Sequence, residues 1–295
     1  MSQDYSEREL REIEGWRYRI DPDDRTAWID DGHSDGQAIF TLPEFVTIDG
    51  MRYRVTSVEL GAFYEDPEIE ELIIPDSYEY IDSEAFHNCA KLRRVHIGKG
   101  LKSFCFWCFA GSPIEVMTID PNNPYLKMSE DGSMVLSKDG KHLYYVVIDK
   151  EELVVPEGVE VLGADSISCH EKLEKLALPS TLKVISTEAL AECRKLTEIV
   201  LPYGVIGIWL QAFRDCGELK SLDFPATVED IGFEAISYND KLETIILRAN
   251  IVVEILDSKP MGIPTESCRL IVPAGLIEEY RNHPYWKSFE NIKPL

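Results

Sequence analysis

The sequence is poor in basic residues: 30 lysines and arginines stand against 53 aspartates and glutamates, for a formal net charge of −23 at pH 7. Nucleic acids and anionic membranes attract positively charged surfaces, so this balance argues against both as partners. Long hydrophobic runs are also lacking. The longest, from Leu143 to Ile148, is far shorter than the roughly 20 apolar residues that a membrane-spanning helix needs. We therefore predict no nucleic-acid partner and no insertion into a membrane.

The N-terminal stretch from Met1 to Ile13 lacks the apolar segment that a secretory signal contains. It is polar and charged throughout. On the sequence as given, a cytoplasmic location is expected, unless a signal was removed from it.

Catalytic and metal-binding motifs are lacking as well. The sequence contains no G-x-S-x-G, no phosphate-binding glycine loop and no dinucleotide-binding fingerprint. Its 6 histidines show no paired spacing of the kind that a metal site uses. The sequence therefore predicts no catalytic residue, no metal ligand and no cofactor, and it favours a protein that is not an enzyme.

What the sequence does contain is a repeat of 23 residues, clearest between Lys172 and Leu247. Each copy opens with a phrase of the form L-x-x-L-x-L-P and continues with A-F-x-x-C or a close variant. The leucine-rich phrases start at Leu173, Leu196, Leu219 and Leu242. A fixed period of roughly 20 to 29 residues built on L-x-x-L-x-L is typical of leucine-rich repeats.

The period has a physical cause. The last two apolar positions of the phrase are two residues apart, so both face the same side of an extended chain. One such strand cannot bury its apolar face alone, whereas parallel strands stacked about 4.8 Å apart share one core. The predicted fold is an α/β leucine-rich repeat solenoid, rich in β-structure. Its parallel sheet is expected on the concave face, with short helical turns on the convex face.

The repeats divide the chain into five predicted parts. The first part is expected to cap the first coil, because terminal repeats are atypical. Two Asp-Gly turns, at Asp131 and Asp139, predict an inserted three-stranded meander. A helix over Leu276–Asn282, with Trp286 and other aromatic side chains, is expected to plug the last coil. The parts are 1–63 (N-terminal cap of strands and a hairpin), 64–119 (first repeat block), 120–151 (inserted β-meander), 152–267 (second repeat block) and 268–295 (C-terminal strand and capping helix).

Five of the 7 cysteines fall into two groups. Cys89, Cys193 and Cys216 share one slot of the repeat, where a small buried hydrophobic side chain is expected. Cys105 and Cys108 form a C-x-x-C pair, a spacing that redox enzymes use with a thiolate of low pKa. The repeat register accounts for this pair without a redox role, because Cys108 occupies an inward-facing position. A thiol redox enzyme is therefore only a less favoured alternative.

The motifs together resemble a known family. The A-F-x-x-C turns, the L-x-x-L-x-L-P strands, the insert D-G-x-x-x-S-K-D-G and the ending VPAGLIEEYRNHPYWKSFENI are similar to those of the BspA-like leucine-rich repeat proteins of bacteria. The resemblance extends from about Phe40 to the end of the chain. It implies a β-rich solenoid with a non-enzymatic binding role, often at the cell surface or secreted, and it supplies no catalytic residue.

The side chains that flank the middle apolar position of each strand are expected to point outward from the sheet. One of the two resulting columns is largely apolar or β-branched, which either reflects β-propensity or marks an interaction strip rimmed by charge. The favoured hypothesis is a module that binds a protein partner through this concave face. The alternatives are a surface or secreted adhesin that binds glycan or matrix, and a thiol redox enzyme using Cys105 and Cys108. The predicted partner-binding residues are Ile73, His96, Val154, Lys175, Ala177, Glu198, Val200, Asp223 and Ile246.

Overall fold

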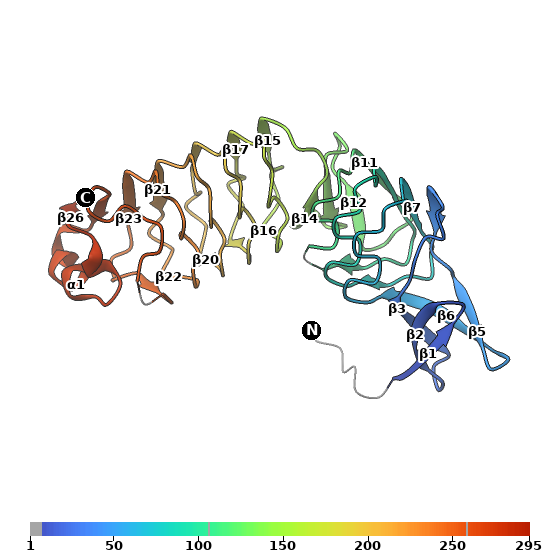
Figure 1. Cartoon of the computed structure of the whole chain (residues 1–295). Helices are drawn as coiled ribbons and strands as arrows, with labels where there is room; N and C mark the ends of the chain where they lie inside the picture. Colours follow the sequence, from blue (N-terminus) through green and yellow to red (C-terminus); the bar gives the residue numbers. More distant parts are fainter. Residues whose placement is uncertain (1–7, 106, 258) are drawn as a thin grey trace. The chain divides into compact units, whose positions relative to one another are not determined.

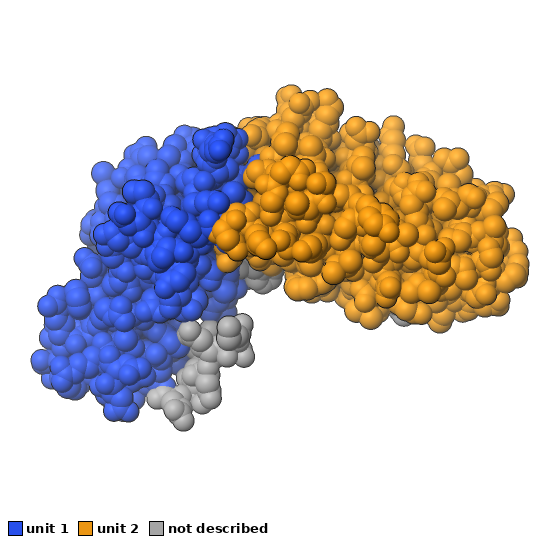
Figure 2. All heavy atoms as spheres, turned by 180° about the vertical axis from the view of Figure 1, so that it is seen from behind, with its two compact units in different colours: residues 1–138 blue, residues 139–295 orange. Residues whose placement is uncertain are grey.

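The computed structural model describes residues 8–105, 107–257 and 259–295. The chain divides into two compact units, unit 1 (Met1–Lys138) and unit 2 (Asp139–Leu295), which are coloured separately in Figure 2. In both units the backbone winds in successive coils whose strands stack side by side (Figure 1).

Unit 1 contains two sheets and a hairpin. The first sheet has the order β1-β2-β3-β6-β8-β10, with β5 paired to β6; β1, β2 and β3 are antiparallel, and β3, β6, β8 and β10 are parallel. The second sheet is parallel throughout, in the order β4-β7-β9-β11, and β12 pairs antiparallel with β13. The strands are β1 (Glu9–Ile13), β2 (Trp16–Asp21), β3 (Thr26–Asp31), β4 (Ile39–Thr41), β5 (Phe45–Ile48), β6 (Met51–Val58), β7 (Glu71–Ile74), β8 (Tyr80–Ile81), β9 (Arg94–Ile97), β10 (Ser103–Phe104), β11 (Val116–Ile119), β12 (Leu126–Met128) and β13 (Met134–Ser137).

Unit 2 is built from parallel strands. On one side of its coils lie β15-β17-β19 and β21-β23-β25-β26, and on the opposite side β14-β16-β18-β20 and β22-β24 (Figure 1). The elements are β14 (His142–Val146), β15 (Glu152–Val154), β16 (Val161–Leu162), β17 (Lys175–Ala177), β18 (Val184–Ile185), β19 (Glu198–Ile199), β20 (Gly207–Ile208), β21 (Ser221–Phe224), β22 (Asp230–Ile231), β23 (Thr244–Leu247), β24 (Glu254–Ile255), β25 (Arg269–Val272), the 3₁₀ turns η2 (Ala274–Leu276) and η3 (Trp286–Ser288), helix α1 (Ile277–Asn282) and β26 (Asn291–Pro294).

The coils stack in register, as the 23-residue period predicts. Leu176 lies opposite Ile199 in neighbouring strands, and Leu222 lies opposite Ile245. All four side chains are buried, with at most 7% of their surface exposed. Equivalent residues therefore form interior rows, and the predicted solenoid of stacked parallel strands is confirmed.

The turns opposite the leucine-rich strands are not helical, which corrects the α/β assignment with its short helices on the convex face. In the first of these turns Phe63 N donates to the Ala85 carbonyl of the next coil at 2.9 Å, whereas Tyr64 N donates locally to Gly61 at 3.0 Å. An α-helix instead needs a continuous series of bonds to the residue four back. Residues with positive φ also recur four apart, at Glu84 (57°) and Asn88 (56°), and each one interrupts a right-handed run. The fold is therefore mostly β.

The cysteine slot of the repeat has a polar role that its sequence pattern did not indicate. Cys89, Cys193 and Cys216 are buried as predicted, but each thiol donates to a carbonyl 26 residues earlier, at 3.3, 3.1 and 3.2 Å respectively. Asn239 fills the same slot and its Nδ2 donates to the Phe213 carbonyl at 2.8 Å. At each of the three positions that were predicted to be only apolar, the cysteine thiol therefore supplies a hydrogen bond to a buried backbone carbonyl.

The few basic residues are used to pair neighbouring coils. Because residues 23 apart lie side by side, a lysine or arginine meets an acid of the preceding coil. Such pairs are surface contacts screened by water, so they reinforce the register more than they stabilise the fold. They include Lys91–Glu68, Arg94–Glu71, Lys99–Asp76, Lys102–Glu79, Lys175–Glu152, Lys183–Glu160 and Lys241–Glu218.

The C-terminal segment closes the last coil of unit 2. Trp286 is fully buried and its Nε1 donates to the Val253 carbonyl at 2.8 Å. Its ring packs edge-on against Tyr285 at 4.8 Å between centroids and against Tyr280 at 6.2 Å. These aromatic side chains pack at the end of the last coil, and helix α1 begins at Ile277, one residue later than the expected start.

In unit 1, Glu59 is a buried carboxyl at the junction between the N-terminal strands and the first coil. Its backbone N–H donates to the Ile29 carbonyl at the end of β3, and only 7% of the residue is exposed. Burial, followed by the nearby Asp82 carboxylate, raises the pKa of Glu59 to about 7, although Arg19 opposes the shift. The other charged groups around Glu59 are Asp30 and Arg8.

We expect Glu59→Gln to stabilise the protein at pH 8 by about 2 kcal/mol and to change little at pH 4. The carboxyl is protonated in both folded and unfolded chains below about pH 4.5. As the pH rises towards 7, only the unfolded chain ionises freely, so the wild type loses stability that the glutamine variant keeps. Urea unfolding of both proteins at the two pH values measures this, and an equal difference at pH 4 and pH 8 would contradict it.

Candidate functional site

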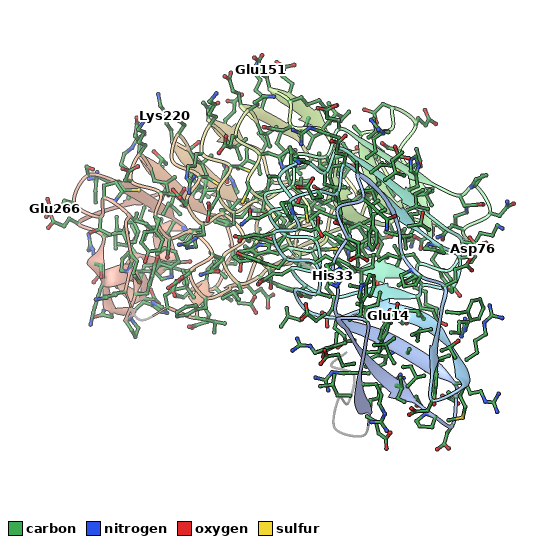
Figure 3. The ribbon with its side chains drawn as sticks, turned by 45° about the vertical axis from the view of Figure 1, so that its right-hand side comes forward. Glu14, His33, Asp76, Glu151, Lys220 and Glu266 are labelled. Carbon is green, nitrogen blue, oxygen red and sulfur yellow. The ribbon has the colours of Figure 1, made fainter. Side chains whose placement is uncertain are left out.

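The candidate site is the outer surface of the leucine-rich strands, which we call the strand face. It is formed by the outward-pointing side chains of β7, β9 and β11 in unit 1 and, separately, of β15, β17, β19, β21 and β23 in unit 2. Charged side chains also project from the loops that lead into these strands, as Figure 3 shows for Glu151 and Lys220.

The apolar part of the strand face of unit 2 is a row of three aliphatic side chains. Val154 and Ala177 are directly opposite each other in β15 and β17, and Val200 follows β19 in the next coil. Val154 is 68% exposed and Val200 is 79% exposed. Adjacent strands are about 4.8 Å apart, so these side chains form one continuous strip.

A charged row runs beside the apolar strip. Lys175 lies between Glu152 and Glu198 in the paired strands, and its Nζ is 2.7 Å from Glu152 Oε1. The hydrogen bond to Lys175 lowers the pKa of Glu152. Glu198 forms no ion pair within the part of the chain that the structure describes. The strip thus has a rim that offers one unpaired carboxylate.

The next two predicted residues along the face differ from this pattern. Asp223 and Ile246 are neighbours in β21 and β23, and both are only half-buried. Arg248 Nε and Nη2 bind the two carboxylate oxygens of Asp223 at 2.6 and 2.7 Å. Because Arg248 already binds both carboxylate oxygens of Asp223, Asp223 is a weaker candidate for partner contact than Val200.

In unit 1 the strand face is polar. His96 Nδ1 lies 2.6 Å from Thr118 Oγ1, and its Nε2 lies 3.2 Å from Glu71 Oε1. The hydrogen bond from Arg94 lowers the pKa of Glu71. Ile73, the remaining predicted residue of this unit, lies opposite His96 in the paired strands.

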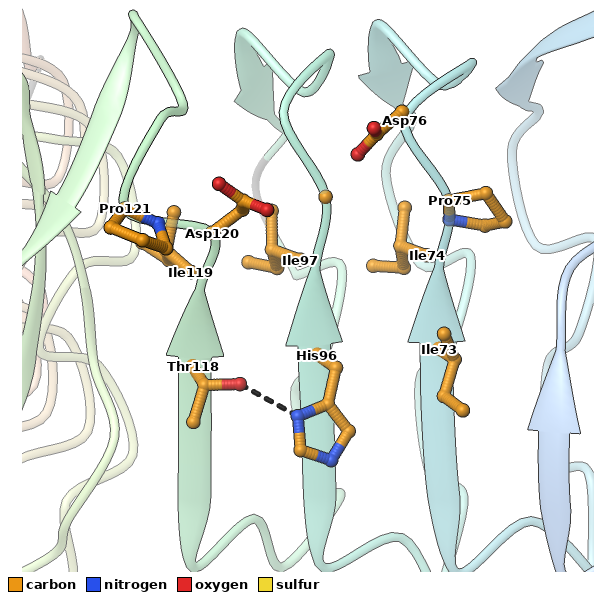
Figure 4. Close-up of a pocket in the computed structure, with 11 residues that line it drawn as sticks. Ile73, Ile74, Pro75, Asp76, His96, Ile97, Thr118, Ile119, Asp120 and Pro121 are labelled. Atoms are coloured by element: carbon orange, nitrogen blue, oxygen red, sulfur yellow. Dashed lines mark hydrogen bonds between the residues drawn. The ribbon is translucent and has the colours of Figure 1, made fainter.

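A shallow hollow of about 420 Å³ lies at the ends of β7, β9 and β11 (Figure 4). Ile73, His96 and Thr118 line it below, and Asp76 and Asp120 lie at its upper edge. Lys99 Nζ is 3.0 Å from Asp76 Oδ2, which keeps this acid paired. Ile73 and His96 were predicted from the sequence, whereas Thr118 and the acidic edge were not, although aspartate follows the strand end in two of these coils.

The C-x-x-C pair has the opposite electrostatics from a redox site. Cys108 is buried, and burial raises its pKa well above the ordinary value for a thiol. Burial, followed by the nearby Asp82 carboxylate, raises the pKa of Cys105 to about 11. A reactive thiol requires a lowered pKa, so the geometry disfavours the redox alternative.

The described residues form neither a metal-binding cluster nor a membrane-spanning helix. Among residues 8–105, 107–257 and 259–295, no group of three or more histidine, cysteine or acidic side chains is arranged to hold a metal ion. In the same ranges, no helix combines the length and the apolar character needed to cross a membrane.

Comparison with known families decides the classification. A family profile described as "BspA type Leucine rich repeat region" matches residues 55–129 and 140–257 in 6 copies. The chain belongs to the BspA-type leucine-rich repeat family. Proteins of this family are generally non-enzymatic interaction or adhesion modules. No curated protein matches the chain.

Solved structures of bacterial leucine-rich repeat proteins share the fold. The pneumococcal vaccine antigen PcpA is 17% identical, with 97% of this chain and 98% of that chain covered and a TM-score of 0.53. A leucine-rich repeat protein from Eubacterium ventriosum is 15% identical, with 82% and 78% covered and a TM-score of 0.56. At these identities the likeness concerns the fold alone.

Proposed function

We propose that this BspA-type protein is a non-enzymatic interaction module that binds a protein partner through the strand face of unit 2. The observation that carries the proposal is the exposed strip of Val154, Ala177 and Val200. Strand positions that face solvent usually hold polar residues. A contiguous apolar strip with a charged rim is instead typical of a protein interface.

A protein partner fits the strip better than a glycan does. Sugar-binding surfaces rely on exposed aromatic rings that stack on the sugar, and the strip and its charged rim are made of aliphatic and charged side chains. An aliphatic strip about three strands wide instead matches the apolar side chains of another protein. The Glu198 carboxylate at its rim favours a partner that carries a basic residue at that place.

We expect Val200→Arg to weaken partner binding at least tenfold, which corresponds to about 1.4 kcal/mol, because it places a charge at one end of the apolar strip, where Val200 is more exposed than Val154. The measurement uses a photo-crosslinking amino acid at position 177, between the two valines, in extracts of the native organism. A specific covalent adduct is expected, and Val200→Arg is expected to abolish it.

The matched control carries the same crosslinker at Glu266, an exposed position outside the strip (Figure 3). Circular dichroism establishes that each variant is folded. An adduct at position 177 that persists in the folded Val200→Arg protein would reject the strand face as the binding surface. So would the same adduct pattern from positions 177 and 266.

A further inference from the structure

A second apolar surface lies on the opposite side of the coils of unit 2. We call it the turn-side patch; its members are Ile206, Trp209, Leu210, Phe233 and Leu256, all exposed. Trp209 is 52% exposed and Leu256 is 72% exposed. In the two preceding coils the slot of Ile206 holds Glu160 and Lys183, which form an ion pair. One coil therefore replaces a charged position with an apolar one.

The patch is continuous across three coils. Gly232 N donates to the Ile208 carbonyl at 2.8 Å, which places Gly232 beside Trp209. Ile231 pairs with Ile255 in β22 and β24, so Leu256 lies on the other side of Gly232. The indole and Leu256 thus flank a residue that carries no side chain.

Phe233 extends this surface. Gln211 N donates to the Phe233 carbonyl at 2.9 Å, so Phe233 lies beside Leu210 in the neighbouring coil. The patch therefore presents two aromatic rings and three aliphatic side chains together.

Two glycines support the patch by leaving room. A Cβ on Gly207 would lie 3.1 Å from Trp209 Nε1, so the indole lies against the backbone of its own strand. A Cβ on Gly232 would lie 2.4 Å from the Trp209 carbonyl carbon. Neither glycine has positive φ, so backbone conformation does not require them. Glycine is needed at position 232 because the Trp209 backbone approaches it closely, and at position 207 because the Trp209 indole packs against it.

Acidic side chains border the patch. The Gly232 N–H bond to the Ile208 carbonyl sets residues 23 apart side by side, so the exposed Glu229 and Asp230 follow Ile206 and Gly207 in the next coil. Within the described residues, neither Glu229 nor Asp230 forms an ion pair. Glu254 lies opposite Asp230 in β24, and its Oε2 is 3.3 Å from His283 Nε2. The patch therefore combines apolar anchors with carboxylates that lack cationic partners.

We infer that the turn-side patch binds a cationic amphipathic segment of a protein partner, with its apolar face on Trp209 and Phe233 and its lysines or arginines on Glu229 and Asp230. Charge complementarity selects this occupant. A second copy of the chain would bring another net charge of −23 against the same carboxylates. Amphipathic segments that lay their apolar face on exposed apolar side chains are a recurring mode of peptide recognition. The inference stands independently of the strand face.

The test uses two synthetic amphipathic peptides of equal length, one of leucine and lysine and one of leucine and glutamate. Fluorescence anisotropy of the labelled peptides measures binding to the whole chain. We expect the leucine–lysine peptide to bind, and the other not to bind. Trp209→Ser and Phe233→Ser are each expected to raise the Kd at least tenfold, with circular dichroism confirming the fold.

The charge contribution is tested by the double variant Glu229→Lys/Asp230→Lys. Its matched control is Asp23→Lys/Asp24→Lys, which makes the same change in net charge at an exposed turn of unit 1. Only the first pair is expected to weaken binding more than tenfold. Val200→Arg on the strand face is expected to leave it within twofold, so the two proposals fail separately.

Several outcomes would overturn the inference. Equal weakening by the two lysine pairs would show that the peptide responds only to net charge. If Trp209→Ser bound the leucine–lysine peptide as tightly as the wild type, Trp209 would not be a contact of the peptide. Self-association of the wild-type chain that Trp209→Ser abolishes would assign the patch to a second copy instead.

Discussion

Replacing Leu196 with alanine is expected to lower the free energy of unfolding by about 2–5 kcal/mol. Leu196 is fully buried in the middle of the array, with its backbone N–H donating to the Cys193 carbonyl at 3.0 Å. The alanine leaves a cavity in a coil that packs only against the coil before it and the coil after it. In a solenoid each repeat is stabilised mainly by its adjacent repeats, so one cavity weakens both interfaces.

The matched control for this experiment is Val200→Ala in the same coil. Val200 is 79% exposed, so its truncation removes little buried surface and should change stability by less than about 0.5 kcal/mol. Urea unfolding of the three proteins, followed by circular dichroism, provides the comparison. Similar unfolding midpoints for Leu196→Ala and Val200→Ala would contradict the assigned register.

The stacking register could be predicted from the sequence because it follows from the period. Once residues 23 apart are neighbours, the interior row of Leu176 and Ile199 and the ion pair between Lys175 and Glu152 both follow. The exposure of Val154 and Val200 follows from the alternation of side chains along a strand. Local repetition thus determines both the core and the outward face.

Other features depend on contacts that the period does not encode. The turns were expected to be helical, but every second amide in them bonds to the next coil, as Phe63 does to Ala85, and this bonding pattern is visible only in the stacked structure. Arg248 reaches Asp223 across 25 residues rather than 23, so a column of equivalent positions does not predict the pair. The turn-side patch could have been found from the sequence, because Ile206 interrupts the column of charged residues formed by Glu160, Lys183 and Glu229.

Replacing Trp286 with alanine should have the largest effect on stability, about 3–5 kcal/mol. The side chain is fully buried, so its removal opens the end of the last coil and leaves the Val253 carbonyl without its 2.8 Å donor. Terminal caps keep an array soluble by covering the apolar edge of its last repeat, so aggregation is expected to accompany the loss of stability. Because a solenoid opens from its ends, hydrogen exchange should accelerate first in β26 and β25 and then in β23.

Tyr285→Phe is the matched control within the same aromatic cluster. The Tyr285 hydroxyl is buried and has no hydrogen-bond partner among the described residues, so its removal should be neutral or stabilising by up to about 1 kcal/mol. Trp286→Phe should lie between the other two variants, because it keeps a ring in the cluster but loses the bond to Val253. If stability falls in the order Tyr285→Phe, Trp286→Phe, Trp286→Ala, the stabilising contribution comes from the side chain that packs into the end of the last coil, and not from aromatic content alone. Equal protection of β25 in the wild type and in Trp286→Ala would mean that the C-terminal segment packs against the array without closing it.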